Sequence, residues 1–262
     1  MGGTVVRNAL LRRTVLSASA ASLVLLATAC GGSGKADAKP SGPASSSASA
    51  PAAPAAKGKT DAELTPLLVA QADLTDHVLE PVSAEDAKGG EDSTSDKPEC
   101  LPLVKAQSTA AIGTASGIAR VIVVAKGKEP AANASPEEKV KAAMDALKAT
   151  ATSVTLQSYE GKGAAEAFGQ LKSAAVPCAG GYTADQGGES GKVTKVTQAA
   201  PVTGGDEALA YTVVGDADGE PFTTQLVVVR KGNTLATFSA ISLGGTAEQP
   251  TAVVAAQLKK LG

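Results

Sequence analysis

The chain contains no tryptophan, three phenylalanines, three tyrosines and a single histidine, His77, among its 262 residues. A hydrophobic core must therefore be built from Val, Leu, Ile and Ala, each of which buries less area than an aromatic side chain. One imidazole is too few for most hydrolytic sites or for a zinc site of cysteine and histidine. We therefore expect a protein that is not an enzyme and that holds no metal or cofactor, although a Ser-Lys or paired-carboxylate site stays formally open.

Two patterns resemble a metal or proton-sensing site but have simpler explanations. Asp216, Asp218 and Glu220 resemble calcium ligands, but an EF-hand loop has its glycine at the sixth position, and Gly219 comes fourth. We expect a hairpin turn there instead. His77 is expected to be a surface or half-buried histidine at a helix end, with a pH-sensing or ligand role as the alternative.

The chain has little excess of either charge, with 24 basic and 26 acidic residues. The first 29 residues hold three arginines and no acidic residue, so a chain without them would have 21 basic and 26 acidic residues, a net charge of −5. A mildly acidic domain does not attract polyanions. Nucleic acid is therefore not an expected partner.

The N-terminus has the pattern of a bacterial lipoprotein signal. Arg7, Arg12 and Arg13 precede an uncharged apolar run over residues 14–29, which is too short for the roughly 20 residues that cross a bilayer. The run ends in Leu26-Ala27-Thr28-Ala29-Cys30, which resembles the lipobox, where the cysteine is acylated and becomes the new N-terminus. We expect residues 1–29 to be a signal peptide and Cys30 to anchor the protein in the membrane on the extracytoplasmic side. The arginine pair also resembles a twin-arginine signal, so the export route stays open.

The next segment is expected to be a disordered tether over residues 30–60. It consists almost entirely of Gly, Ala, Ser and Pro with scattered Lys. Such a composition cannot bury enough apolar surface to offset the entropy of ordering it. Residues 61–262 are long enough for one folded domain.

Cys100 and Cys178 are the other two cysteines of the chain. An oxidising compartment favours a disulfide between them. The alternatives are a metal site or a reactive thiol, but histidine ligands are lacking. Closing a loop across 78 positions is expected to stabilise the fold by about 4–5 kcal/mol.

Helices are predicted from apolar residues at helical spacing. A capping box at Ser135-Pro136-Glu137-Glu138 begins the clearest of them, which has Val140 and Met144 on its apolar face. Residues 85–97 are expected to form a solvated loop. The other helices are predicted near Thr65-Pro66, over residues 101–107 and 164–176, and from Pro250 onward.

Strands are predicted over residues 118–125, 152–159, 193–199, 208–214, 222–230 and 235–243. In the second of these, Val154 and Leu156 share one face, and the polar residues 153, 155 and 157 share the other. Turns at 216–219 and 231–233 indicate hairpins. Consecutive hairpins form an antiparallel sheet on which helices with one apolar face must pack. The predicted fold class is α+β, an antiparallel sheet flanked by helices, with one disulfide.

Several segments, through their order and spacing along the chain, resemble the PknH-like extracellular sensor domain. This domain occurs on receptor kinases and in stand-alone lipoproteins of actinobacteria. The resemblance covers the chain from about Leu64 and rests on Pro98-Glu99-Cys100, the strand over 154–159 leading into Gly163-Ala164-Ala165-Glu166-Ala167-Phe168, Cys178-Ala179-Gly180, and Arg230-Lys231-Gly232-Asn233. It implies an antiparallel sheet flanked by helices, a cleft for an unidentified ligand, and a disulfide-bonded Cys178. This chain differs in lacking a second cysteine pair and the tryptophan before the helix-end cysteine, and in having the extra capped helix over 135–149.

Three side chains are candidates for contacts with a ligand. Arg120 lies inside a β-branched run, where a buried charge needs a carboxylate, solvent or a cleft. Tyr159 and Tyr211 combine an apolar ring with a polar tip, although core packing is the alternative for both. We expect a non-enzymatic binding or sensor lipoprotein that recognises a small ligand or an envelope protein. The alternatives are an envelope lipid or glycolipid carrier, which needs a large apolar cavity, and a weakly marked hydrolase.

Overall fold

A computed structural model describes residues 57–262 except 128, 218, 243 and 245. The predicted signal peptide, Cys30 and all of the predicted tether up to residue 56 lie outside the described residues. Among the residues described, no helix is long and apolar enough to cross a membrane.

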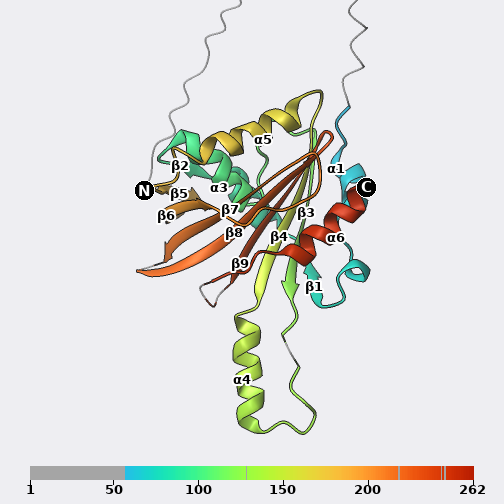
Figure 1. Ribbon diagram of the computed structural model, residues 1–262, viewed down its shortest axis with the longest axis vertical. Coiled ribbons are helices and arrows are strands. Elements are labelled where there is room, and N and C mark those ends of the chain that lie inside the picture. Colours follow the sequence, from blue (N-terminus) through green and yellow to red (C-terminus); the bar gives the residue numbers. More distant parts are fainter. Residues whose placement is uncertain (1–56, 128, 218, 243, 245) are drawn as a thin grey trace, which may run out of the picture. The chain divides into compact units, whose positions relative to one another are not determined.

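The core of the domain is one antiparallel sheet of nine strands in the order β1-β3-β4-β9-β8-β7-β6-β5-β2 (Figure 1). Strands β7, β8 and β9 are joined as hairpins, as the turn residues predict. The strands are β1 (His77–Glu80), β2 (Thr94–Ser95), β3 (Gly117–Ala125), β4 (Thr150–Ser158), β5 (Tyr182–Gln186), β6 (Glu189–Gln198), β7 (Glu207–Ala217), β8 (Glu220–Lys231) and β9 (Thr234–Ser242).

Helices cover both faces of the sheet. We name each face after one of its helices, α3 or α6. The α3 face is covered by α3 and α5, and the α6 face by α1 and α6 (Figure 1). The predicted α+β class is therefore confirmed. The helices are α1 (Asp61–Leu64), α2 (Ala84–Glu91), α3 (Leu101–Gln107), α4 (Pro136–Leu147), α5 (Gly163–Ala174) and α6 (Thr251–Leu261), with 3-10 turns η1 (Thr65–Leu67), η2 (Gln71–Asp73) and η3 (Pro98–Cys100).

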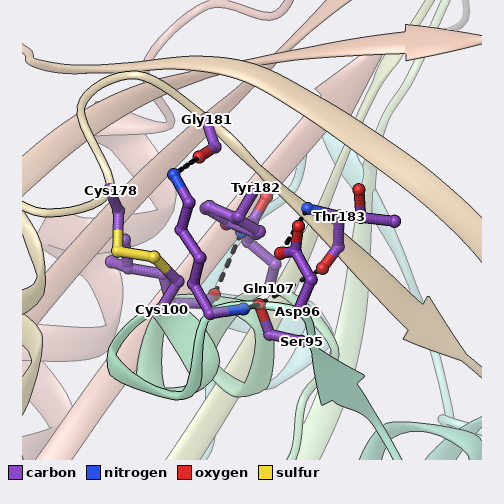
Figure 2. Close-up of a disulfide and its surroundings, with 10 residues drawn as sticks. Ser95, Asp96, Cys100, Gln107, Cys178, Gly181, Tyr182 and Thr183 are labelled. Carbon is purple, nitrogen blue, oxygen red and sulfur yellow. Dashed lines mark hydrogen bonds between the residues drawn. A yellow bond between two sulfur atoms is a disulfide. The ribbon is translucent and has the colours of Figure 1, made fainter.

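The disulfide between Cys100 and Cys178 joins the start of α3 to the loop after α5, with 5.8 Å between the Cα atoms (Figure 2). Both cysteines are fully buried. Nearby, the Lys97 ammonium donates a hydrogen bond of 2.6 Å to the Gly181 carbonyl. The predicted pairing is confirmed, and it fixes the two helices of the α3 face to each other.

Two sequence-based predictions were wrong near the N-terminus of the domain. Residues 85–97 are not a loop, because they contain α2 and β2. The Ser83 hydroxyl accepts the Asp86 amide at 3.0 Å, an N-cap that starts α2. The first predicted helix ends early: α1 and η1 give way to extended backbone at Leu68. His77 accordingly lies half-buried in β1 and not at a helix end.

Strand β5 was not predicted. Its sequence, YTADQ, has no β-branched run. Its pairing with β6 depends on a turn at Gly187 and Gly188, whose φ angles are +62° and +87°. Both lie in the left-handed region that favours glycine.

Helix α4 forms as predicted, with the capping box of Ser135 and Glu138. However, it projects beyond the end of the sheet and does not pack on it (Figure 1). Val140 is 64% exposed and Met144 is 53% exposed. The expectation that each helix with one apolar face packs on the sheet was therefore wrong for α4.

Candidate ligand groove

A groove runs along the part of the α3 face that α3 and α5 leave uncovered. It consists of two adjoining hollows of about 390 and 490 Å³, which share Gln107, Ser153, Gln186 and Glu189. The first hollow lies between α3, the β5–β6 hairpin and the sheet, and the second continues beneath α2. We call the two together the sheet groove. Each volume is in the range that binds small molecules.

The floor of the sheet groove is a set of hydroxyl groups. Ser153 on β4 is the register partner of Ser239 on β9, and Thr224 on β8 lies on the same face. Ser239 is 8% exposed and Thr224 is 5% exposed. In the described part of the chain, none of these three hydroxyls takes part in a side-chain hydrogen bond. Ser153 is half-buried, and none of the three oxygens is a buried atom that lacks a partner, so all three hydroxyls are open to water or a ligand.

Phe222 provides an aromatic surface at one end of the floor. It is half-buried, and its register partner on β7 is Gly215. The ring lies across this glycine so closely that a Cβ atom at position 215 would overlap it. Gly215 therefore leaves room for the ring, because any side chain there would displace it.

The wall beside the disulfide contains Tyr182 and Gln107 (Figure 2). The Gln107 amide donates one hydrogen bond to the Tyr182 hydroxyl and one to the Leu103 carbonyl, each at 3.0 Å. Burial raises the pKa of Tyr182 to about 12, and this hydrogen bond lowers the pKa in part. The phenol is therefore neutral at physiological pH and keeps its proton to donate.

α2 and the β5–β6 hairpin face each other over the groove at Gly89 and Gly187. A Cβ atom at Gly89 would lie 3.4 Å from the Cα atom of Gly187, so there is room for about one methyl group between the two segments. Charged side chains occur at the rim, with Glu85 and Asp86 on α2, and Glu189 and Lys192 on β6. Carboxylates thus outnumber cations around the second hollow, while the hydroxyl floor is uncharged.

Arg120 reaches the edge of the second hollow but is already paired. Its guanidinium donates 2.6 Å hydrogen bonds to the Glu91 carboxylate and to the carbonyl of Thr109, which lines the groove. Its side chain is 16% exposed. Of the three surroundings expected for Arg120, namely a carboxylate, solvent or a cleft, the structure shows a carboxylate partner. Arg120 thereby connects α2 to β3.

Tyr159 and Tyr211 lie in different surroundings. The Tyr159 hydroxyl is buried within hydrogen-bond distance of the Ile112 carbonyl (2.9 Å) and of Gln157 Oε1 (2.8 Å), and burial raises its pKa. Tyr211 lines a second groove of about 460 Å³ between α5 and strands β6 and β7. Burial also raises the pKa of Tyr211.

The three predicted ligand contacts do not form one site. Arg120 is on β3 and Tyr211 on β7, four strands apart, or about 19 Å at the usual strand spacing. Sequence reasoning missed the hydroxyl floor and Phe222. The alternation in β4 was the available signal, because it placed only polar residues on one face of a central strand.

Among the described residues, no group of three or more His, Cys, Asp or Glu side chains is arranged to hold a metal ion. Asp216 Oδ1 instead accepts the Gly219 amide at 2.9 Å within the β7–β8 turn. The hairpin predicted for this segment is therefore present.

Comparisons with known proteins found likeness in structure but no match in sequence. No family model matches the chain, and no curated protein matches it. The chain is similar in structure to the extracellular domain of PknH from Mycobacterium tuberculosis, with 13% sequence identity and a TM-score of 0.45. The similarity covers 78% of this chain and 97% of that domain.

Proposed function

We propose that this protein is an extracytoplasmic lipoprotein, anchored through Cys30, whose domain binds a ligand in the sheet groove without transforming it. The observation that carries the binding function is the floor of Ser153, Thr224 and Ser239. Their hydroxyls lie at the base of a groove and are open to it, and among the described residues none takes part in a side-chain hydrogen bond. A ligand that hydrogen-bonds to them can replace the water that these hydroxyls otherwise hold.

The proposed location rests on two independent features. The N-terminal sequence has the order of a lipoprotein signal, from the arginines through the apolar run to Cys30. The disulfide between Cys100 and Cys178 is of the kind that persists in oxidising compartments outside the cytoplasm. Both features support an exported domain.

The location is tested by growing the producing bacterium with an alkyne analogue of palmitate. The wild-type chain is expected to take up the label, to begin at Cys30 and to partition into the detergent phase of a two-phase extract. Cys30→Ser is the matched control, because it removes only the thiol that would be acylated. Recovery of an unlabelled wild-type chain that retains residues 1–29 would contradict the anchor.

The binding function is tested by native mass spectrometry of the full chain, purified gently from its own envelope. We expect a bound molecule on the wild-type chain, and a lower occupancy on Ser153→Ala and Ser239→Ala. Thr223→Val is the control, because Thr223 is adjacent to Thr224 but its hydroxyl accepts the Ala247 amide outside the groove. Equal occupancy in all four proteins would place the ligand elsewhere, and the groove proposal would fail.

The alternative of a lipid carrier is less well supported by the groove. A carrier of acyl chains needs an apolar cavity. Hydroxyl and carboxamide groups instead form the floor and the junction of the two hollows. Acyl chains among the co-purified molecules would favour the carrier.

A further inference from the structure

We infer that the ligand of the sheet groove is an uncharged saccharide, which stacks on Phe222 and hydrogen-bonds to Ser153, Thr224 and Ser239. This inference rests on the proposed binding function and specifies the chemical class of the ligand. Three properties of the groove carry it: the aromatic surface, the hydroxyl floor and the distribution of charge.

The aromatic surface matches the apolar side of a sugar ring. A pyranose presents a face of C–H groups, which packs on the flat side of an aromatic ring as other apolar groups do. Phe222 is half-buried and lies across Gly215 on the groove side of the sheet. A rigid ring held in this way loses little conformational entropy when a ligand packs on it.

The hydroxyl floor matches the edge of the same sugar ring. Each serine or threonine hydroxyl donates one hydrogen bond and accepts others, as each sugar hydroxyl does, so the two sets pair in either direction. Ser153 and Ser239 are register partners on adjacent strands, roughly 5 Å apart. A sugar unit can bridge this distance with two of its hydroxyls.

The charge around the groove disfavours ionic ligands. Arg120, which donates to the carbonyl of the groove-lining Thr109, is paired with the Glu91 carboxylate. An anion in the second hollow would meet Glu85, Asp86 and Glu189, and in the first hollow the single cation, Lys192, is matched by Glu189. A cationic ligand would lose its hydration at a floor without a carboxylate. An uncharged ligand incurs neither cost.

The chain has no tryptophan, which permits a direct test. Phe222→Trp puts a single indole at the stacking position. In the full chain, purified in detergent, we expect millimolar maltotriose or mannotriose to change its fluorescence saturably. Trigalacturonic acid is the anionic comparison, and it should change the emission at least tenfold less. Tyr211→Trp is the control for position, because it reports on the second groove and should not respond.

The floor is tested in the same Phe222→Trp background. Thr224→Val and Ser239→Ala each remove one hydroxyl and should weaken trisaccharide binding by about 5- to 10-fold. Thr223→Val should leave the affinity unchanged within twofold. In the wild-type background, Gly215→Ala displaces the Phe222 ring and should reduce saturation-transfer NMR signals from the trisaccharide at least fivefold.

The outcomes separate the saccharide inference from the proposed function. If neither neutral trisaccharide changes the indole emission while a native ligand occupies the groove, the saccharide class is wrong and the binding function stands. If the anionic trisaccharide binds as well as the neutral ones, the charge argument is wrong and the inference fails. If no native ligand is found and no trisaccharide binds, both proposals fail.

Discussion

Phe238 and Ser239 are consecutive residues of β9, yet they face opposite sides of the sheet and meet different surroundings. Phe238 is fully buried on the α6 face with Val154 and Val227 of the neighbouring strands. Ser239 lies on the α3 face, beside Ser153 at the floor of the sheet groove. The same strands thus provide an apolar core on one side and hydroxyl groups on the other. The comparison shows that alternate residues of one strand can serve stability and binding separately.

Removing the disulfide is expected to have the largest effect, and it should act first on the α3 face. The 78-residue separation corresponds to about 4.5 kcal/mol of unfolding free energy in the chain-entropy treatment. The double variant Cys100→Ala/Cys178→Ala should lose about this amount in urea denaturation. Amide exchange should rise in α3 and α5 before it rises in α1 and α6, because only the first pair is joined by the disulfide. A uniform rise in exchange would contradict this order.

Truncating the two neighbours on β9 tests the comparison directly. Phe238→Ala should lower the unfolding free energy by about 3–5 kcal/mol, because it leaves a cavity in a dry core. Ser239→Ala should change it by less than about 1 kcal/mol, since its hydroxyl has no protein partner to lose. Chemical denaturation of both variants provides the measurement. Equal losses would mean that both faces are structural.

The sequence predicted much of this sheet because its signals are local. Alternation in β4, the turns between β7, β8 and β9, and the capping box at Ser135 each lie within a few residues. Strand β5 and helix α2 were missed because their signals are weak. β5 has no β-branched run, and α2 is a short polar helix with two glycines.

The groove was not predictable in the same way. Small hydroxyl residues at alternate strand positions also occur where a sheet face meets solvent. They become the floor of a groove here only because α2, α3 and the β5–β6 hairpin come over the sheet from other parts of the chain. Arg120 shows the same limit: the sequence indicates a charge in a strand, but not its partner Glu91, which lies in a segment for which the sequence predicts a loop.

Tyr182 gives the α3 face a dependence on pH. Burial raises its pKa from 10.0 to about 12, so the folded state favours the neutral phenol. Its contribution is fully present below pH 10 and is lost as the pH rises from 10 to 12, by about 3 kcal/mol in all. Tyr182→Phe should make this fall shallower by about that amount, while Tyr159 and Tyr211, whose pKa values burial also raises, still contribute to it. Tyr182→Phe also loses the hydrogen bond from Gln107, which should lower the unfolding free energy by about 1 kcal/mol near neutral pH. Tyr211→Phe is the control. In urea denaturation at each pH, it should keep the fall in unfolding free energy that Tyr182 causes between pH 10 and about 12.

Helix α4 extends the comparison to an apolar surface outside both cores, and here we expect the smallest effect. Val140 and Met144 are more than half exposed, so replacing them changes the apolar area that is buried on folding very little. The double variant Val140→Ser/Met144→Ser should change the unfolding free energy by less than about 0.5 kcal/mol. Val154→Ser is the matched control: Val154 is fully buried on β4, and an unpaired hydroxyl there should cost at least about 2 kcal/mol. Thermal denaturation provides the measurement. If the α4 variant lost as much unfolding free energy as Val154→Ser, the apolar side of α4 would have to pack on the domain in solution. Helix α4 would then be part of the hydrophobic core. The α3 face would be the one region where a buried core lies beside an open groove.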